Sequence, residues 1–127
     1  MLPRASRTSL IAVVDDDISV RESVESLLKS VGFRVITYSS AEEFMDSPRL
    51  DSADCLILDV RLDGMSGPDL QRELKIAGHS IPIVFVTAHE TEALRERMMA
   101  DGAIDCLLKP FTDDTLLNAV EVALRSN

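Results

Sequence analysis

The sequence predicts an α/β fold, a doubly wound five-stranded parallel sheet with five helices. Short apolar runs of four to six residues alternate with longer segments of helical period, which is the pattern of parallel strands joined by crossover helices. Several of these runs are continuously apolar, as strands covered by helices on both faces are. A hydrophobic content of 46% and a charged content of 28% over 127 residues fit one ordinary globular domain.

The predicted strands fall into a central and an outer group. The continuously apolar runs lie at residues 10–14, 55–58 and 83–86, and we expect them in the middle of the sheet. The runs at residues 35–38 and 104–108 are more mixed in polarity, and we expect them nearer the edges. Together with the intervening helices these strands account for nearly the whole chain.

The first helix is predicted from its start signal and its period. Ser19 and Glu22 have the spacing of a capping box, and Gly32 is a typical stop. Between them one helical face is apolar, which predicts that this face packs on the sheet. The residues of this face are Val20, Val24, Leu27, Leu28 and Val31.

The other helices have start and stop signals of their own. A second capping box beginning at Ser40 opens a short helix that ends before Pro48. The third helix begins with Pro68 in its first turn, the fourth ends at Gly102, and Thr112 is the predicted N-cap of the fifth. Their predicted inward residues are Phe44, Leu70, Leu74, Leu94, Met98, Leu116, Val120, Ala123 and Leu124.

The charge and the ends of the chain limit the classes of function. A net charge of −9 repels phosphate backbones and anionic lipid, so we expect no direct nucleic-acid contact by this domain. No apolar run approaches the ~20 residues of a membrane span, and residues 1–9 lack the apolar stretch of a signal peptide. We therefore expect a cytoplasmic protein without membrane contact. The domain is expected at residues 8–126, after a flexible segment at residues 1–7.

The two cysteines lie inside apolar runs. Cys55 and Cys106 are therefore predicted to be reduced core residues, because a free thiol packs like a small hydrophobe. No further cysteine or histidine completes a metal-binding set with them. A two-cysteine redox switch stays open, since the sequence does not give their separation.

Polar residues directly follow four of the predicted strands. In a doubly wound sheet, ligands bind outside the carboxyl ends of the strands, so these residues are expected to converge on one rim. Each has an ordinary structural explanation, as a helix cap, a turn residue or a solvated amine. Those explanations do not account for the whole set. The set consists of Asp15, Asp16 and Asp17 after the first strand, Asp59 after the third, Thr87 and Ala88 after the fourth, and Lys109 and Pro110 after the fifth.

Phosphoryl transfer accounts for all of these residue types together. Clustered carboxylates repel one another unless a divalent cation neutralises them, and hard oxygen ligands suit Mg²⁺. With the metal bound, Asp59 stays ionised and can attack phosphorus in line. Lys109 offsets charge on the equatorial oxygens, and Thr87 can donate a hydrogen bond to one of them. The predicted product is an acyl phosphate on Asp59.

Four motifs resemble the receiver domains of response regulators, the CheY-like superfamily. They are V-V-D-D-D at residues 13–17, L-I-L-D-V-R-L-D-G-M-S-G at 56–67, V-T-A at 86–88 and K-P-F at 109–111. Within the superfamily, A-E-E-F at residues 41–44 and the turn R-L-D-G-M-S-G look most similar to receivers of the FixJ/NarL type of nitrogen-fixation regulator. Such receivers usually precede a helix-turn-helix domain, which is not present in this sequence.

The resemblance implies a flavodoxin-like sheet of order 2-1-3-4-5 and a two-component system. It implies a sensor histidine kinase as partner, transcription regulation as output and Mg²⁺ as cofactor, and it leaves a phosphorylation-dependent homodimer open. It also implies a cis peptide between Lys109 and Pro110. The implied site residues are Asp59 as phosphoacceptor, Asp16 as direct metal ligand with Asp15 nearby, the main-chain carbonyl of Arg61 as a further metal ligand, and Thr87, Ala88 and Lys109 around the phosphoryl group.

Two positions depart from the usual pattern of the family. Cys106 stands where the fifth strand usually has a switching Tyr or Phe, and Asp63 replaces the usual proline of the turn after Asp59. By strand alternation Cys106 is expected to share a face with Ile104 and Leu108, in a fixed core position. The phosphorylation chemistry does not depend on either residue. Cys106 bears on the route from Asp59 to an output surface, because a thiol lacks the reach of a switching aromatic ring.

Three alternative functions fit the sequence less well than phosphoryl transfer to Asp59. An aspartyl-phosphate hydrolase of the haloacid dehalogenase kind needs a second acid two residues after the nucleophile, where this chain has Arg61. A receiver-like adaptor that works without phosphorylation is expected to lose acidic residues or Lys109, and this chain has them all. A dinucleotide site needs a glycine-rich turn after the first strand, and the sequence has none.

Overall fold

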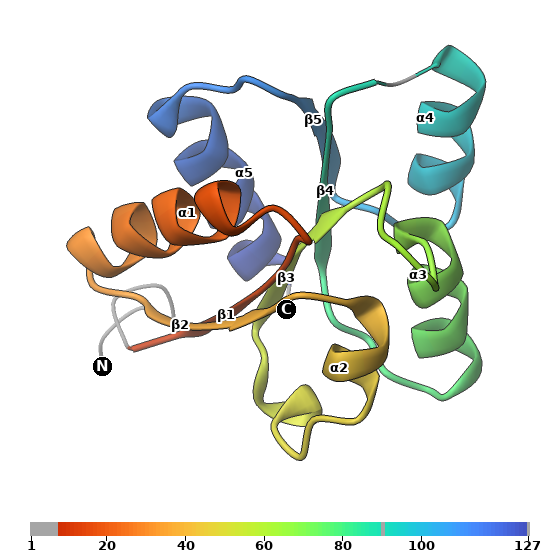
Figure 1. Ribbon diagram of the computed structural model, residues 1–127, viewed down its shortest axis with the longest axis horizontal. Helices are drawn as coiled ribbons and strands as arrows, with labels where there is room; N and C mark the ends of the chain where they lie inside the picture. Colours follow the sequence, from red (N-terminus) through yellow and green to blue (C-terminus); the bar gives the residue numbers. More distant parts are fainter. Residues whose placement is uncertain (1–7, 90, 127) are drawn as a thin grey trace.

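Five parallel strands form the centre of the computed structural model, which describes residues 8–89 and 91–126 (Figure 1). The strands are hydrogen-bonded in the order β2-β1-β3-β4-β5, which confirms the flavodoxin-like order and the two predicted edge strands. The segment expected to be flexible, residues 1–7, lies outside the described residues. The strands are β1 (Leu10–Val14), β2 (Arg34–Tyr38), β3 (Cys55–Asp59), β4 (Ile83–Thr87) and β5 (Asp105–Leu108).

Five α-helices lie at the positions that the sequence predicted; four of them connect successive strands, and the fifth follows the last strand. A short 3-10 helix, η2 (Leu50–Ser52), precedes β3 and was not predicted. Among the described residues, no helix has both the length and the apolar character needed to cross a bilayer. The α-helices are α1 (Ile18–Ser30), α2 (Ala41–Met45), α3 (Gly67–Ile76), α4 (Glu92–Ala100) and α5 (Asp113–Arg125).

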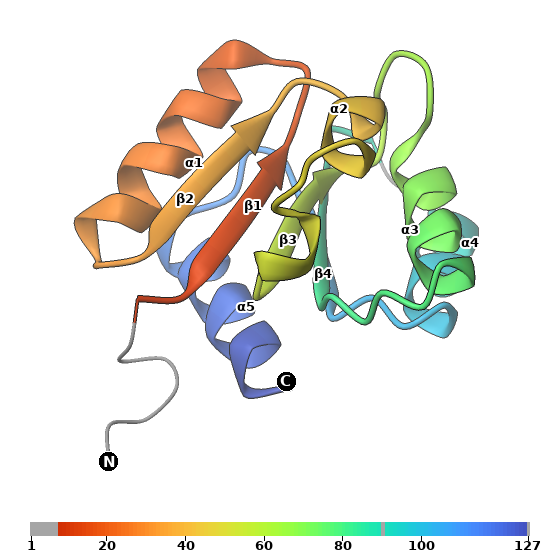
Figure 2. The same ribbon diagram turned by 90° about the horizontal axis from the view of Figure 1, so that it is seen from below.

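The helices form two layers, one on each face of the sheet (Figure 2). Helices α1 and α5 cover one face, and α2, α3 and α4 cover the other. Successive side chains of a strand point to opposite faces, so each buried strand contributes to two separate cores. In β1, Ile11 and Val13 pack with α1 and α5, whereas Ala12 and Val14 pack with the other helices. This double coverage explains why β1 is apolar throughout and why β3 and β4 are apolar up to their last residues, Asp59 and Thr87.

The N-caps of the helices confirm most of the predicted starts and correct one. The hydroxyls of Ser40 and Thr112 accept hydrogen bonds from the third residue of α2 and of α5, as expected. The predicted capping box at Ser19 is wrong, because the N-cap of α1 is Asp17. Its carboxylate accepts a hydrogen bond from the Ser19 amide at 2.9 Å. The Asp17 carboxylate, two residues before Ser19, thus accepts hydrogen bonds from the free amides of the first turn, and Ser19 is not the cap.

Three residues that were predicted to face the core with their neighbours lie elsewhere. Val31 is 50% exposed, because α1 ends at Ser30 and Val31 is already the C-cap. Ile104 precedes β5 and packs with the α1 and α5 core, so it does not share a face with Cys106. Leu108 is 54% exposed, so it does not line the core either. Cys106 itself is buried in the α3 and α4 core, which confirms the core position predicted for it.

The positions of the two cysteines decide against a direct disulfide switch. Both are buried thiols, as the sequence predicted. Cys55 packs on the α1 and α5 side of the sheet, and Cys106 packs on the opposite side. Strand β4 also separates their two strands. Because a disulfide needs adjacent Cβ atoms that face one another, these thiols cannot pair within the fold.

Candidate functional site

The carboxyl ends of four strands meet at one rim of the sheet. Asp15 and Asp16 follow β1, Asp59 is the last residue of β3, Thr87 is the last residue of β4, and Lys109 follows β5. These ends lie beside one another because the strands pair in parallel, β1 with β3, β3 with β4, and β4 with β5. The structure therefore brings the predicted polar residues to one edge, as the topology of the sheet requires.

Three carboxylates form a tight cluster at this rim. One oxygen of each of Asp15, Asp16 and Asp59 lies within 4.8 Å of the others. Asp15 and Asp59 are only 1% and 6% exposed, whereas Asp16 is open to solvent. Two desolvated carboxylates and one accessible carboxylate are a donor set that a hard divalent cation fits, because its charge offsets theirs.

Lys109 supplies a positive charge to the same cluster. Its Nζ lies 2.9 Å from Oδ2 of Asp15 and 3.4 Å from Oδ2 of Asp59. The Lys109 amide donates to the Thr87 carbonyl at 2.7 Å, and the peptide to Pro110 is cis, as predicted. Burial by itself disfavours the charged amine, but the hydrogen bond to Asp15 and the two negative charges outweigh it and raise the pKa of Lys109. The amine is therefore positively charged at neutral pH.

The pKa of Asp59 is raised to about 6, foremost because the carboxyl is buried and next because of the negative charge of Asp15. Lys109 and the amide of Arg61 act in the opposite direction. That amide donates to Oδ1 of Asp59 at 3.2 Å, and the Asp17 amide donates to Oδ1 of Asp15 at 2.9 Å. Asp59 is thus a carboxyl whose ionised form needs an additional cation for full stabilisation.

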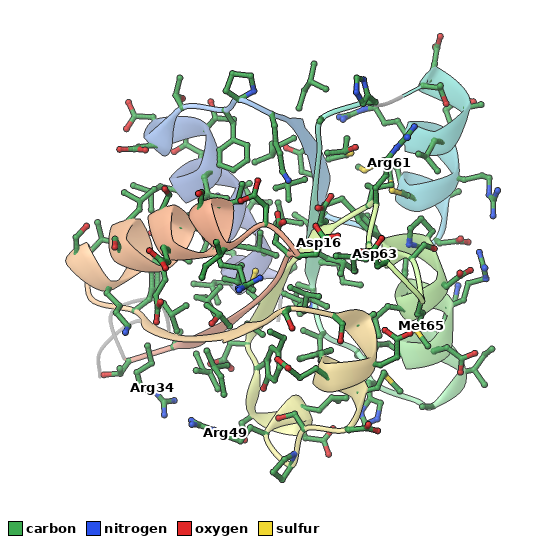
Figure 3. All side chains as sticks on the ribbon, in the orientation of Figure 1. Asp16, Arg34, Arg49, Arg61, Asp63 and Met65 are labelled. Carbon is green, nitrogen blue, oxygen red and sulfur yellow. The ribbon has the colours of Figure 1, made fainter. Side chains whose placement is uncertain are left out.

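The turn after Asp59 packs directly against the strand that it leaves. The Gly67 amide donates to the Val60 carbonyl at 3.0 Å, which closes the loop between β3 and α3. A Cβ atom on Gly67 would lie 2.4 Å from the Asp59 carbonyl oxygen, so only glycine fits there. Arg61 lies in this loop, two residues after Asp59, and is exposed at the rim (Figure 3).

The hydroxyl of Thr87 is bound within its own turn. Thr87 is fully buried, and its Oγ1 donates to the His89 carbonyl at 2.7 Å and accepts from the His89 amide at 3.2 Å. Ala88 between them is exposed. Of the predicted set, Thr87 and Ala88 share the rim with the carboxylates, but no direct contact joins the Thr87 hydroxyl to Asp59 in this state. The sequence analysis did not predict that His89 binds the Thr87 hydroxyl, since nothing in the sequence indicates which carbonyl a strand-end hydroxyl binds.

Two further residues near the rim were missed at the level of sequence. Arg21 of α1 donates from Nη1 to the main-chain carbonyl of Asp15 at 2.7 Å. Glu42 of α2 accepts a hydrogen bond from the Met65 amide at 2.8 Å. The contact of Glu42 spans 23 residues. No local signal predicts such a contact, because it depends on how α2 lies beside the loop.

Comparison with known proteins agrees with this geometry. Residues 11–121 match the family model described as the response regulator receiver domain. The chain belongs to this family. Among curated relatives, the receiver is 46% identical over 119 residues to nodulation protein W of Bradyrhizobium diazoefficiens, covering 94% of this chain and 52% of that protein. It is 38% identical over 115 residues to the transcriptional regulatory protein FixJ of the same organism, covering 91% and 56%.

A solved structure of a similar receiver covers most of this chain. The structure named FixJ-N has a TM-score of 0.85 and 31% identity to this receiver, over 95% of this chain and 97% of that one. These similarities confirm the resemblance to receivers of the FixJ type. The receiver described here spans about half the length of the curated relatives that it matches.

Proposed function

We propose that this receiver accepts a phosphoryl group on Asp59 from a sensor histidine kinase and thereby regulates an output domain or partner. The observation that carries the proposal is the Lys109 amine within hydrogen-bond reach of two buried carboxylates, Asp15 and Asp59. A lysine that faces both the nucleophile and its acidic neighbour is placed for an anion that arrives between them.

The cluster fits Mg²⁺ as the cofactor. Three carboxylate oxygens within 4.8 Å of one another, one of them accessible from solvent, are the hard donors that this cation prefers. We assign Asp16, Asp59 and the main-chain carbonyl of Arg61 as its ligands, with Asp15 beside them. When bound, the cation supplies positive charge that keeps Asp59 ionised and offsets charge on the transferred group.

The transfer itself needs little covalent chemistry from the chain. An oxygen of Asp59 forms a bond to phosphorus while the bond from phosphorus to the donor imidazole nitrogen breaks, and the electron pair leaves with the imidazole. Lys109 then donates to a phosphoryl oxygen. We propose that the Thr87 hydroxyl exchanges the His89 carbonyl for another phosphoryl oxygen, with exposed Ala88 lining the same position. This exchange would release the loop that leads to α4.

The proposed partners follow from the family and from the charge of the domain. The curated relatives include a protein named as a transcriptional regulator, and the receiver spans about half of its length. We therefore propose a cytoplasmic regulator in which a helix-turn-helix output domain acts on DNA. The receiver itself, with a net charge of −9, would not contact nucleic acid. We propose that phosphorylation-dependent homodimerisation of the receiver carries the signal from the receiver to the output domain.

Labelling by a small phosphodonor tests the central assignment. We expect acetyl phosphate to add one phosphoryl group to the wild-type chain in the presence of Mg²⁺ and none after chelation, as read from intact mass. Asp59→Asn should abolish the labelling. Asp63→Asn is the matched control, because it removes an exposed carboxylate from the same loop and should leave the labelling unchanged. If Asp59→Asn gains the group at the wild-type rate, Asp59 is not the acceptor.

A further inference from the structure

A carboxylate of α2 holds the loop that follows the phosphoacceptor strand. Oε2 of Glu42 accepts a hydrogen bond from the main-chain amide of Met65 at 2.8 Å. This hydrogen bond to the Met65 amide is also the main reason that the pKa of Glu42 is lowered, so the group is charged at neutral pH. In Figure 3, Met65 lies at the side of the loop next to α2, while Arg61 lies at the other end of the loop. The contact therefore joins α2 to the loop that contains Arg61.

The residue before Met65 makes room for this carboxylate. Gly64 has a φ of +78°, and a Cβ atom built on it would lie 2.6 Å from Oε2 of Glu42. A side chain at position 64 would therefore both strain the backbone and displace the carboxylate. Gly64 and Glu42 thus fit one another, and the turn has the shape that the hydrogen bond needs.

The loop is held at both ends by contacts of its own. At its start the Arg61 amide donates to Oδ1 of Asp59 at 3.2 Å, and at its end the Gly67 amide donates to the Val60 carbonyl at 3.0 Å. Asp63, in the middle, is exposed and replaces the proline that is usual in this family. A proline would lock φ near −65°, and Asp63 imposes no such limit. The hydrogen bond from Met65 to Glu42 fixes the second half of this loop to a neighbouring helix.

We propose that Glu42 is a positioning residue for the metal site. Glu42 holds the turn at residues 64 and 65 and so orients the loop, with the main-chain carbonyl of Arg61 facing the carboxylate cluster. Glu42 itself does not contact the metal. The inference rests on the proposed function, because it takes Arg61 as a ligand. It explains how a loop that lacks the usual proline can present that ligand in one orientation. Outer partners of metal ligands act in this way in many sites.

The length and the charge of the side chain at position 42 can be varied separately. Glu42→Gln keeps the reach and an acceptor oxygen but removes the charge, whereas Glu42→Asp keeps the charge and shortens the reach by one methylene. Glu42→Ala removes both. We expect the dissociation constant for Mg²⁺, measured by calorimetric titration of the full chain, to stay within about twofold of wild type for Glu42→Gln. It should rise roughly tenfold for Glu42→Asp and Glu42→Ala, the lower end of the effect of outer-shell partners.

Glu43→Gln is the matched control. Glu43 is an exposed acid on the same helix, and its carboxylate accepts a hydrogen bond from the Ser39 amide rather than from the Met65 amide. We expect wild-type Mg²⁺ affinity for this variant. The backbone amide resonance of Met65 should shift in Glu42→Asp and Glu42→Ala and not in Glu43→Gln, which reports the contact itself. Thermal midpoints of all four variants show that each is folded.

Two results would overturn the proposal. If Glu42→Gln weakens Mg²⁺ binding as much as Glu42→Ala while Glu42→Asp does not, the carboxylate acts only through its charge. If all three variants bind Mg²⁺ as wild type does, Glu42 has no positioning role. Either result leaves the proposed function standing, since wild type still binds the metal. A wild-type chain that neither binds Mg²⁺ nor is phosphorylated would instead contradict the proposed function itself.

Discussion

The amine of Lys109 lies 2.9 Å from a carboxylate oxygen of Asp15, a residue 94 positions earlier in the chain that is 1% exposed. Removing one partner of such a buried pair leaves the other charge desolvated. We expect Lys109→Ala to lower the free energy of unfolding of the metal-free protein by about 2 kcal/mol, below the range for fully buried pairs because the rim opens to solvent. Urea unfolding with a chelator at pH 8 measures this.

Lys29→Ala provides the comparison for that experiment. Lys29 pairs with Glu25 at 2.9 Å on the surface of α1, where both side chains are solvated. Exposed pairs of this kind contribute about 0.3 to 0.5 kcal/mol. Equal losses of stability in the two variants would mean that the pair at the rim is no stronger than a surface pair, and that Lys109 is not needed to balance Asp15 and Asp59.

The raised pKa of Asp59 predicts a pH-dependent effect of Asp59→Asn in the metal-free protein. The pKa is about 6 in the folded chain, against an ordinary value of 3.8, so the folded state holds this proton more tightly. The tighter proton binding therefore stabilises the folded state at low pH, and this stabilisation is lost as the pH rises through about 6. Because asparagine does not ionise, the variant should exceed wild type in stability by roughly 1 to 2 kcal/mol at pH 8, a value reduced for solvent screening.

The difference between Asp59→Asn and wild type should shrink as the pH falls toward about 5, where the folded carboxyl is largely protonated. Denaturant titrations at several pH values, each with a chelator, measure it. Asp63→Asn again serves as the control, since Asp63 is exposed. A stability difference that stays constant from pH 8 to pH 5 would show that ionisation of Asp59 does not cause it.

Mg²⁺ should stabilise the folded chain by mass action, because the cluster of three carboxylates exists only in the fold. The expected gain is about 2.7 kcal/mol when free metal is a hundredfold above its dissociation constant. Asp16→Asn should remove much of this gain, since Asp16 is the accessible carboxylate of the cluster. Thermal midpoints with Mg²⁺, with Ca²⁺ and with a chelator measure it. A wild-type midpoint that does not move at millimolar Mg²⁺ would count against the metal site.

Cys106→Ala tests whether this receiver works without a switching aromatic residue in β5. The thiol is 4% exposed in the core beneath α3 and α4, so its removal should leave a small cavity and cost about 1 kcal/mol. The Cys106 carbonyl, which accepts from Nη1 of Arg95 at 2.7 Å, is main chain and remains in the variant. The link from α4 to β5 should therefore survive.

We accordingly expect phosphorylation to shift the NMR resonances of α4 in Cys106→Ala as it does in wild type. The proposed route passes from the Thr87 hydroxyl to the His89 carbonyl and on to α4, and it needs no rotamer change at position 106. Loss of the shifts in a Cys106→Ala chain that is still phosphorylated on Asp59 would make Cys106 a switch residue.

The sequence alone determined the fold and the members of the rim. Continuous apolar runs can be buried only between two helical layers, and parallel strands bring their carboxyl ends together. Asp59 and Lys109 were therefore predictable members of one site, although 50 residues separate them. The N-caps Ser40 and Thr112 could also be predicted from the sequence, because capping acts over three or four residues.

Only the tertiary structure decided which groups touch. It showed Asp17 as the N-cap of α1, Ile104 on the opposite face from Cys106, and the hydrogen bond from Met65 to Glu42. These outcomes depend on where a helix starts, how the chain enters an edge strand and how closely α2 approaches a loop. Packing of the whole domain sets such distances to within an ångström, and local propensity and periodicity carry no information at that scale.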